Sequence, residues 1–182
     1  MSYTAQLQDR EVEGVVKSWI NKVIIGLNFC PFAKKEIERN TVRYAISHST
    51  QINAALTVLL DEVALLEQQP DIQTSLVIFP TGFEAFEYYL ELLELANSLL
   101  AQGGYGGIFQ LASFHPNYCF EGEEKDDPAN YTNRSPYPIL HILRESSIEA
   151  VLKRYPNPES IPENNIFRAR ELGSSYLQQL LK

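Results

Sequence analysis

The loop from Phe114 to Pro138, called the long loop below, holds more chemically capable side chains than any other stretch of this sequence. His115 begins it, and a histidine can exchange a proton near neutral pH, which makes this residue a candidate general acid or base. Arg134 carries a planar fork of donors that matches a carboxylate or phosphate, and the neighbouring Asn133 and Ser135 add polar groups. These residues predict a site that anchors a small polar or anionic molecule and moves a proton.

The middle of the long loop is acidic and allows more than one interpretation. Asp127, which is nearest to Asn130 and Asn133, is expected to orient His115 or to help hold a divalent ion. The same acids fit a solvated acidic turn, and Arg134 fits an internal salt bridge to them. The aromatic residues of the loop are consistent both with an ordered active-site loop and with a structural Ω-loop.

The chain has two cysteines, Cys30 and Cys119, which predicts free thiols in a reducing compartment rather than a disulfide framework. Cys30 is a candidate nucleophile, because a thiol at a helix N-terminus with lysines nearby can have a lowered pKa. The apolar neighbours Phe29 and Phe32 favour the alternative of a buried and inert cysteine.

A transition-metal site could be assembled from His115, Cys119, Glu121 and His48, since zinc accepts nitrogen, sulfur and oxygen ligands. The spacing matches no strong zinc signature, so no metal ligand is assigned, and the residues identify no cofactor. His141 lies within an apolar segment and is expected to be a hydrogen-bonded core histidine.

Hydrophobic periodicity predicts the helices that must position these residues. A first helix is expected from about Leu7 to Leu27, and a short second helix from Pro31 through Arg39, with Cys30 as its N-cap residue. Two more are expected at about 53–68 and 83–102, the latter opened by Thr81 and Glu84 in capping-box spacing. Ser146 with Glu149 and Ser160 with Glu163 mark further helix starts. The inner face of the final helix is expected to be Ile166, Ala169, Leu172, Tyr176, Leu177 and Leu180.

Segments rich in β-branched and aromatic residues predict four strands, at 41–47, 74–79, 108–114 and 139–143. Helices alternate with the first three strands, which favours parallel pairing, whereas the last strand follows the long loop and is expected to run antiparallel. The prediction is an α/β or α+β fold with one single-layer mixed sheet of about four strands, covered by helices, in a single globular domain of residues 1–182.

Ligands of open α/β sheets gather at the carboxyl ends of parallel strands. Here these ends are 47–49, 80–82 and 115–116, and the start of an antiparallel last strand brings residues 133–135 to the same edge. We call this edge the rim. His48 and Thr81 therefore join Arg134, Asn133, Ser135 and Asn130 as candidate substrate-binding residues.

The composition narrows the classes of partner. Acidic residues outnumber basic ones by 23 to 15, and a net charge of -8 repels a phosphate backbone, so no nucleic-acid partner is expected. The N-terminus lacks the pattern of a signal peptide, and no run reaches the roughly 18 apolar residues of a membrane span. We expect a cytoplasmic protein with a small-molecule ligand and no membrane partner, and the oligomeric state stays open.

Three motifs together resemble a bacterial family, the domain of unknown function 1415. They are NFCPFA at residues 28–33, FHPNY at 114–118 and NYTNRSPYPILHILRE at 130–145. The resemblance covers essentially the whole chain and implies a stand-alone protein of this length. It carries over no activity, cofactor or catalytic residue.

Three functions are consistent with these residues. The leading hypothesis is an enzyme that acts on a small polar or anionic metabolite at the rim by general acid and base chemistry, with His115, Asp127 and Cys30 as its catalytic candidates. The alternatives are a metal-dependent enzyme that uses histidine and carboxylate ligands, and a non-catalytic ligand-binding or interaction module. Whether the chain is an enzyme is left open by its sequence.

Overall fold

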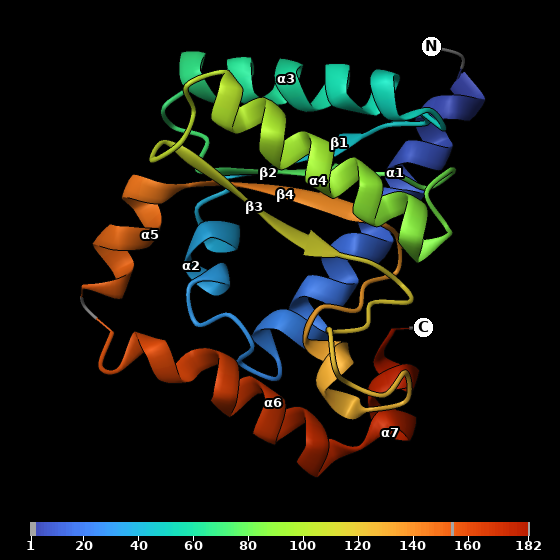
Figure 1. Cartoon of the computed structure of the whole chain (residues 1–182), viewed down its shortest axis with the longest axis vertical. Coiled ribbons are helices and arrows are strands. Elements are labelled where there is room, and N and C mark those ends of the chain that lie inside the picture. Colours follow the sequence, from blue (N-terminus) through green and yellow to red (C-terminus); the bar gives the residue numbers. More distant parts are fainter. Residues whose placement is uncertain (1–2, 154, 182) are drawn as a thin grey trace.

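An open four-stranded sheet forms the centre of the molecule, in a computed structural model that describes residues 3–153 and 155–181 (Figure 1). Its strands are β1 (Val42–Ile46), β2 (Thr74–Ile78), β3 (Phe109–Phe114) and β4 (Ile139–Arg144). The order is β1-β2-β4-β3, in which β1 and β2 pair in parallel and β4 is antiparallel to both of its neighbours. The first three strands thus run the same way and the last one opposes them. The predicted fold class, a mixed sheet covered by helices, is confirmed.

Helical segments surround this sheet. In chain order they are α1 (Tyr3–Trp19), the π-helix η1 (Ile20–Ile25), α2 (Ala33–Glu38), α3 (Ile52–Gln68), α4 (Phe86–Gln102), the 3₁₀-helix η2 (Pro128–Thr132), α5 (Glu145–Leu152), the 3₁₀-helix η3 (Pro158–Ser160), α6 (Ile161–Leu172) and α7 (Ser174–Leu180). Within the described residues, no helix combines the length and the apolar character needed to cross a membrane.

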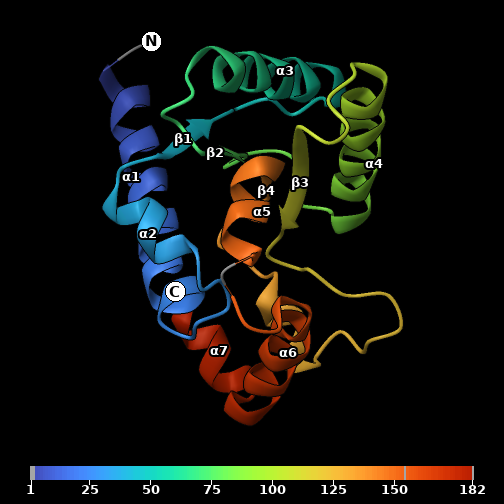
Figure 2. The ribbon, with the colours of Figure 1, turned by 90° about the vertical axis from the view of Figure 1, so that its left-hand side faces the viewer.

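One face of the sheet is covered by α3 and α4, which lie side by side in Figures 1 and 2. Apolar residues at helical spacing along α3, such as Leu59, Val63 and Leu66, are fully buried against it. Leu140 and Ile142 of β4 point to this same face. The first hydrophobic core is therefore a closed layer between two helices and the sheet.

The opposite face packs against α1 and η1, and a second core includes Leu76 and Ile78 of β2 and Ile139 of β4. Ala169 of α6 and Leu177 of α7 belong to the same core. Figures 1 and 2 show α5, α6 and α7 beyond this second face, away from α3 and α4. The second face is thus covered by helices from both ends of the chain.

The expected first helix changes type in its last third. The α-helix ends at Trp19 and continues as a π-helix to Ile25, and Gly26 follows, with its amide donating to the carbonyl of Asn21, five residues earlier (3.0 Å). A side chain at Gly26 would overlap the carbonyl oxygen of Lys22, so glycine permits the wide turn.

Two helix starts predicted from sequence, those of the second and the fourth helix, were wrong. The fourth helix begins at Phe86 and not at 83, because Gly82 and Phe83 both have positive φ angles (75° and 61°), which no α-helix contains. Glu84 accepts a hydrogen bond from the amide of Gly82 (2.9 Å) instead of forming the expected capping box with Thr81.

The second helix begins at Ala33, and its N-cap residue is Phe32 rather than Cys30. The carbonyl of Cys30 accepts a hydrogen bond from the amide of Ala33 (3.3 Å), which closes a turn ahead of the helix. The thiol therefore lies before the helix and does not cap it.

The single final helix expected from the sequence is divided into two helices, α6 and α7. Gly173, with φ 76° and ψ 152°, ends α6 and begins a new direction for α7. The change of direction leaves Leu177 buried but Tyr176 46% exposed, so Tyr176 is not part of the inner face that a single helix predicted.

Candidate functional site

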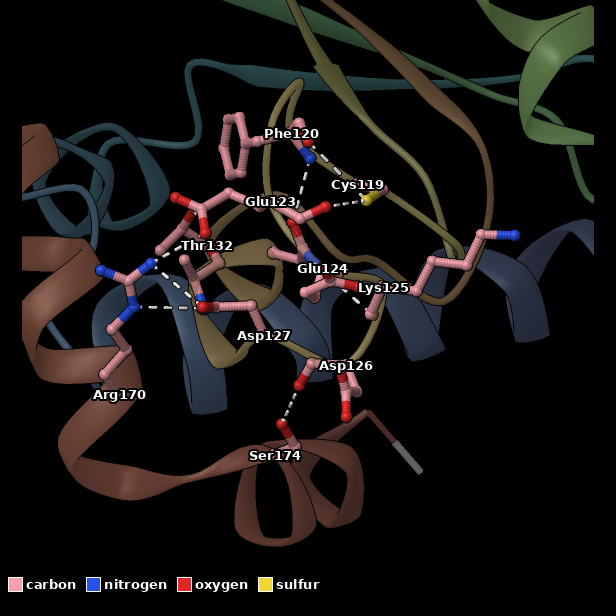
Figure 3. A network of polar contacts seen from close by, with 12 residues as sticks. Cys119, Phe120, Glu123, Glu124, Lys125, Asp126, Asp127, Thr132, Arg170 and Ser174 are labelled. Carbon is pink, nitrogen blue, oxygen red and sulfur yellow. Dashed lines mark hydrogen bonds and ion pairs between the residues drawn. The ribbon is translucent and has the colours of Figure 1, made fainter.

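The long loop is held together by its own polar groups, several of which Figure 3 shows. Asn130 is fully buried, accepts a hydrogen bond from the amide of Phe120 (2.9 Å) and donates to the carbonyl of Glu124 (2.8 Å). The Cys119 thiol donates to the carbonyl of Glu123 (3.5 Å). These contacts use the side chains of Asn130 and Cys119 to fix the shape of the loop.

Asp127 joins the loop to the C-terminal helices. Its carboxylate accepts from the amide of Ala129 (2.7 Å), which caps η2, and forms a two-pronged ion pair with Arg170 of α6 (3.1 and 3.0 Å). The Arg170 guanidinium, and then the Ala129 amide, hold the pKa of Asp127 below its ordinary value. Ser174 of α7 adds a hydrogen bond to the loop carbonyl of Asp126 (2.7 Å) (Figure 3). Asp127 is therefore engaged with α6, and it does not contact His115.

The guanidinium of Arg134 also points into the loop. It donates to the carbonyls of Tyr118 (3.2 Å) and Lys125 (2.6 Å), and it lies over the Tyr131 ring at 4.4 Å from its centre. Its partners are neutral carbonyls and an aromatic face, so the internal salt bridge weighed as an alternative for Arg134 is absent among the described residues.

The neighbours of Arg134 are used in the same way. Asn133 donates to the carbonyl of Ser113 (3.0 Å), and Ser135, which is 1% exposed, donates to the carbonyl of Tyr137 (2.5 Å). The Asn133 bond ties the loop to the end of β3, and the Ser135 bond lies within the loop just before β4.

His115 is completely buried between the rings of Phe86 and Tyr89. Its Nε2 lies 2.9 Å from the carbonyl of Phe83, and its Nδ1 accepts from the amide of Asn117 (3.0 Å). Because a carbonyl only accepts, the proton must be on Nε2. Burial lowers the pKa of His115, and the ring is neutral with neither nitrogen open to a substrate.

The remaining rim residues lie apart from these. His48 forms an exposed contact with Asp9 of α1 (Nε2–Oδ1, 2.8 Å), and Thr81 is exposed at the end of β2. The backbones do share the predicted edge, since the His115 amide donates to the carbonyl of Asn133 (3.1 Å). The side chains at this edge nevertheless have separate surroundings. Among the described residues, no three of the types His, Cys, Asp and Glu gather as they would around a metal ion.

A cavity of about 490 Å³ lies against the second face of the sheet. Side chains of β2, β4 and β3 form one wall, and α1 with η1, α2, α5, the start of α6 and part of the long loop form the others. Figures 1 and 2 show how these elements surround that face. Most of the lining side chains are apolar, and of the residues expected in a site only Cys30 and Asn133 are among them.

His141 is the histidine on the sheet wall of the cavity. It stands at the centre of the wall, because β4 pairs it with Leu76 on one side and with Ala112 on the other. Its Nε2 lies 2.5 Å from the hydroxyl of Thr74, and that hydroxyl donates to the carbonyl of Ile142 (2.6 Å). Burial lowers the pKa of His141 to about 4, so the ring is neutral at physiological pH.

Cys30 reaches the same cavity from the turn before α2. Asn165 of α6 holds this turn by donating to the carbonyl of Phe29 (2.7 Å). Burial raises the pKa of the Cys30 thiol, and the amides of Phe32 and Ala33 offset only part of this shift. The thiol is therefore protonated at neutral pH, and it shares no hydrogen bond with His115 or Arg134 among the described residues.

The cavity was missed by sequence reasoning, although one signal for it was present. His141 was expected to be a satisfied core histidine, and the alternation of its strand does place it on the second face of the sheet, with Ile139 of the second core and Leu143 of the cavity wall. The depth of the space above it depends on where α5 and α6 lie, and periodicity contains no information about that.

Comparison with curated proteins and with solved structures gives no match. The model of one family, described as "Protein of unknown function (DUF1415)", matches residues 11–179. Because this match spans nearly the whole chain, from α1 to α7, and includes every wall of the cavity, the chain belongs to the DUF1415 family.

Proposed function

We propose that this protein binds a small, largely apolar molecule in the cavity on the second face of its sheet. The observation that carries the proposal is the cavity itself, at about 490 Å³ and with a mostly apolar wall. Small-molecule sites have volumes of roughly 300–1,000 Å³ and combine apolar walls with a few placed polar groups.

The rim enzyme remains a prediction with less support. Both nitrogens of His115 are engaged by the backbone, Arg134 is bound to loop carbonyls, and Asp127 is paired with Arg170. A rim substrate would have to displace these contacts before it met a free donor or base. The cavity wall requires no such rearrangement.

Trp19 makes the proposal testable, because it is the one tryptophan of the chain and it lines the cavity. Heptyl methyl ether is a suitable probe, since it is uncharged, flexible and transparent where tryptophan is excited. We expect a saturable change in Trp19 emission as this ether is titrated into the wild-type protein.

A cavity-filling variant provides the comparison. Ala112 faces the cavity from β3, so Ala112→Phe should weaken binding of the ether at least roughly tenfold, about 1.4 kcal/mol. Ala54→Phe is the matched control, because Ala54 is exposed on α3 and should leave the affinity unchanged. If Ala112→Phe fails to fold, Ala33→Phe fills the cavity from α2. Equal affinity in a folded cavity-filling variant and in wild type would refute the proposal.

A further inference from the structure

We infer that His141 sets the ligand class of the cavity: its Nδ1 accepts a hydrogen bond from an O–H or N–H group, so the site selects neutral, apolar molecules that carry one donor, such as alcohols. This inference rests on the proposed function. It follows from the positions of the protons around His141 and from the way the other polar groups of the wall are used.

The hydrogen bonds of Thr74 determine which nitrogen of His141 carries the proton. The Thr74 hydroxyl and the carbonyl oxygen of Ile142 are 2.6 Å apart, and the carbonyl cannot donate, so the hydroxyl proton lies between them. The contact of 2.5 Å between Thr74 and Nε2 must then use a proton on Nε2. The neutral ring therefore has its unshared electron pair on Nδ1.

Nδ1 has no hydrogen-bond partner within the described residues. Among those residues, Tyr44 Oη is the one side-chain polar atom that is fully buried without a partner, so Nδ1 of His141 is not sealed off. The ring lines the cavity, and its neighbour on β3 is the small Ala112, which leaves space beside it. A ligand can reach Nδ1 from the cavity.

The other polar side chains of the wall bond to the protein. The pairs are Glu36 with Thr41, Gln73 with Ser147, Asn133 with Ser113, Thr132 with Ala129 and Asn165 with Phe29. Nδ1 of His141 is thus the unpartnered acceptor on the sheet wall, while Glu36 on α2 and Asn165 on α6 each keep one side-chain oxygen without a partner among the described residues.

Most of the donors of Arg144, the cation of the wall, are engaged by backbone carbonyls, which argues against an anionic ligand. Arg144 donates through Nε to the carbonyl of Ile72 (3.0 Å), and through Nη2 to the carbonyls of Leu66 and Gln69 at the end of α3. A carboxylate in this cavity would lose its water, and Arg144 could offer it only Nη1, the nitrogen that has no partner among the described residues. An alcohol would lose less hydration free energy than a carboxylate, and it would gain the hydrogen bond to Nδ1.

Three probes of similar length test this selection: n-octanol, heptyl methyl ether and octanoate. We expect wild-type protein to bind n-octanol roughly threefold to tenfold more tightly than the ether, the range of one net hydrogen bond. Octanoate should bind more weakly than either. Trp19 emission reports all three titrations.

Two substitutions separate the nitrogens of the ring. His141→Asn places an amide near the position of Nδ1 and should retain part of the preference for n-octanol. His141→Gln reaches toward Thr74 in place of Nε2 but leaves no acceptor at Nδ1, so its preference for n-octanol over the ether should vanish while binding of the ether persists.

The outcomes distinguish this inference from the proposed function. If wild type binds none of the probes, the proposed function fails and the inference fails with it. If the ether binds but n-octanol is not preferred, or if His141→Gln keeps the wild-type preference, the cavity is a binding site and the role of His141 is refuted. Tighter binding of octanoate than of n-octanol would also overturn the ligand class.

Discussion

The three histidines of this chain differ in what each ring can still do. His48 is exposed and paired with Asp9, and His115 has both nitrogens engaged within the protein. His141 uses Nε2 on Thr74 and keeps Nδ1 unpaired at the cavity wall. Of the three, His141 therefore combines a fixed proton position with a lone pair that a small molecule can reach.

Replacing His141 should flatten the pH dependence of stability. Burial lowers its pKa from 6.5 to about 4, so between these values the unfolded chain takes up a proton that the folded chain refuses. The contribution of the neutral ring to the free energy of unfolding is complete above pH 6.5. As the pH falls toward 4, up to roughly 3 kcal/mol of this contribution is lost. Urea unfolding of wild type and His141→Phe from pH 7 to pH 4 measures this difference.

The matched control for this measurement is Ala54→Phe, since Ala54 is exposed on α3 and the substitution changes no titratable group. The lowered pKa values of His115 and Asp127 add slopes of the same sign to every protein compared. The effect of His141 is therefore given by the difference in slope between wild type and the variant. If stability falls with pH in the same way in wild type and in His141→Phe, the lowered pKa of His141 is contradicted.

Residue types alone identified where polar groups gather, but not which of these groups lack a hydrogen-bond partner within the protein. The bonds within the long loop depend on its conformation, in which Asn130 and Arg134 find backbone carbonyls several positions away in sequence. Hydrogen-bond partners at such separations cannot be derived from spacing. Cys30 and Asn133 are the predicted site residues that do reach the cavity.

At the scale of elements, the π-helix η1 lets α1 continue past Trp19 while its apolar side chains stay against the sheet. Ile20, Val23 and Ile24 are all buried, and Ile20 and Ile24 also form part of the cavity wall. The wider turn of a π-helix is thus coupled to the shape of the cavity, as π-bulges often are to functional sites.

Replacing two glycines of this region by alanine should change the stability of the protein in opposite directions. Gly26 has ordinary helical angles, but a Cβ there would overlap the Lys22 carbonyl, so Gly26→Ala should destabilise the protein by roughly 1–3 kcal/mol. Gly14 is exposed in α1 with no atom within 4 Å of such a Cβ, and Gly14→Ala should stabilise by about 0.5–1 kcal/mol. Thermal unfolding of both variants measures the two signs. A stabilised Gly26→Ala protein would show that the backbone relaxes into an ordinary α-helix.

The strands were predicted from sequence to within about one residue at each end, because runs such as TSLVI are rich in β-branched and apolar residues. Helix ends were predicted less well where backbone geometry decides them. The positive φ of Phe83 and the direction of the chain at Gly173 depend on tertiary packing, which no local pattern specifies. A bulky residue such as Phe83 would not be expected there, since positive φ normally favours glycine.

At the scale of the whole molecule, the two faces of the sheet are covered unequally. The face under α3 and α4 is a closed apolar core, whereas the other face has the cavity of about 490 Å³. This cavity is partly open to solvent, and any part of it that water does not fill disappears on unfolding.

Hydrostatic pressure should act on this volume. Unfolding typically changes the volume by about -20 to -100 mL/mol, in proportion to the voids that it eliminates. Ala112→Phe fills part of the cavity, so it should unfold with a smaller volume change than wild type. Trp19 emission under pressure measures both values, with Ala54→Phe as the surface control. The same volume change in Ala112→Phe and wild type would mean that water already fills the space.

The central position of β4 has a consequence for the order of folding. β3 pairs only with β4 in this sheet, and β4 follows it in the chain after the whole of the long loop. A ribosome that has just released β3 therefore exposes two strands, β2 and β3, each with an edge that has no partner yet. Unpaired edges invite pairing with other chains, so the interval until Arg144 emerges is the stage at which a nascent chain of this protein most needs protection from aggregation.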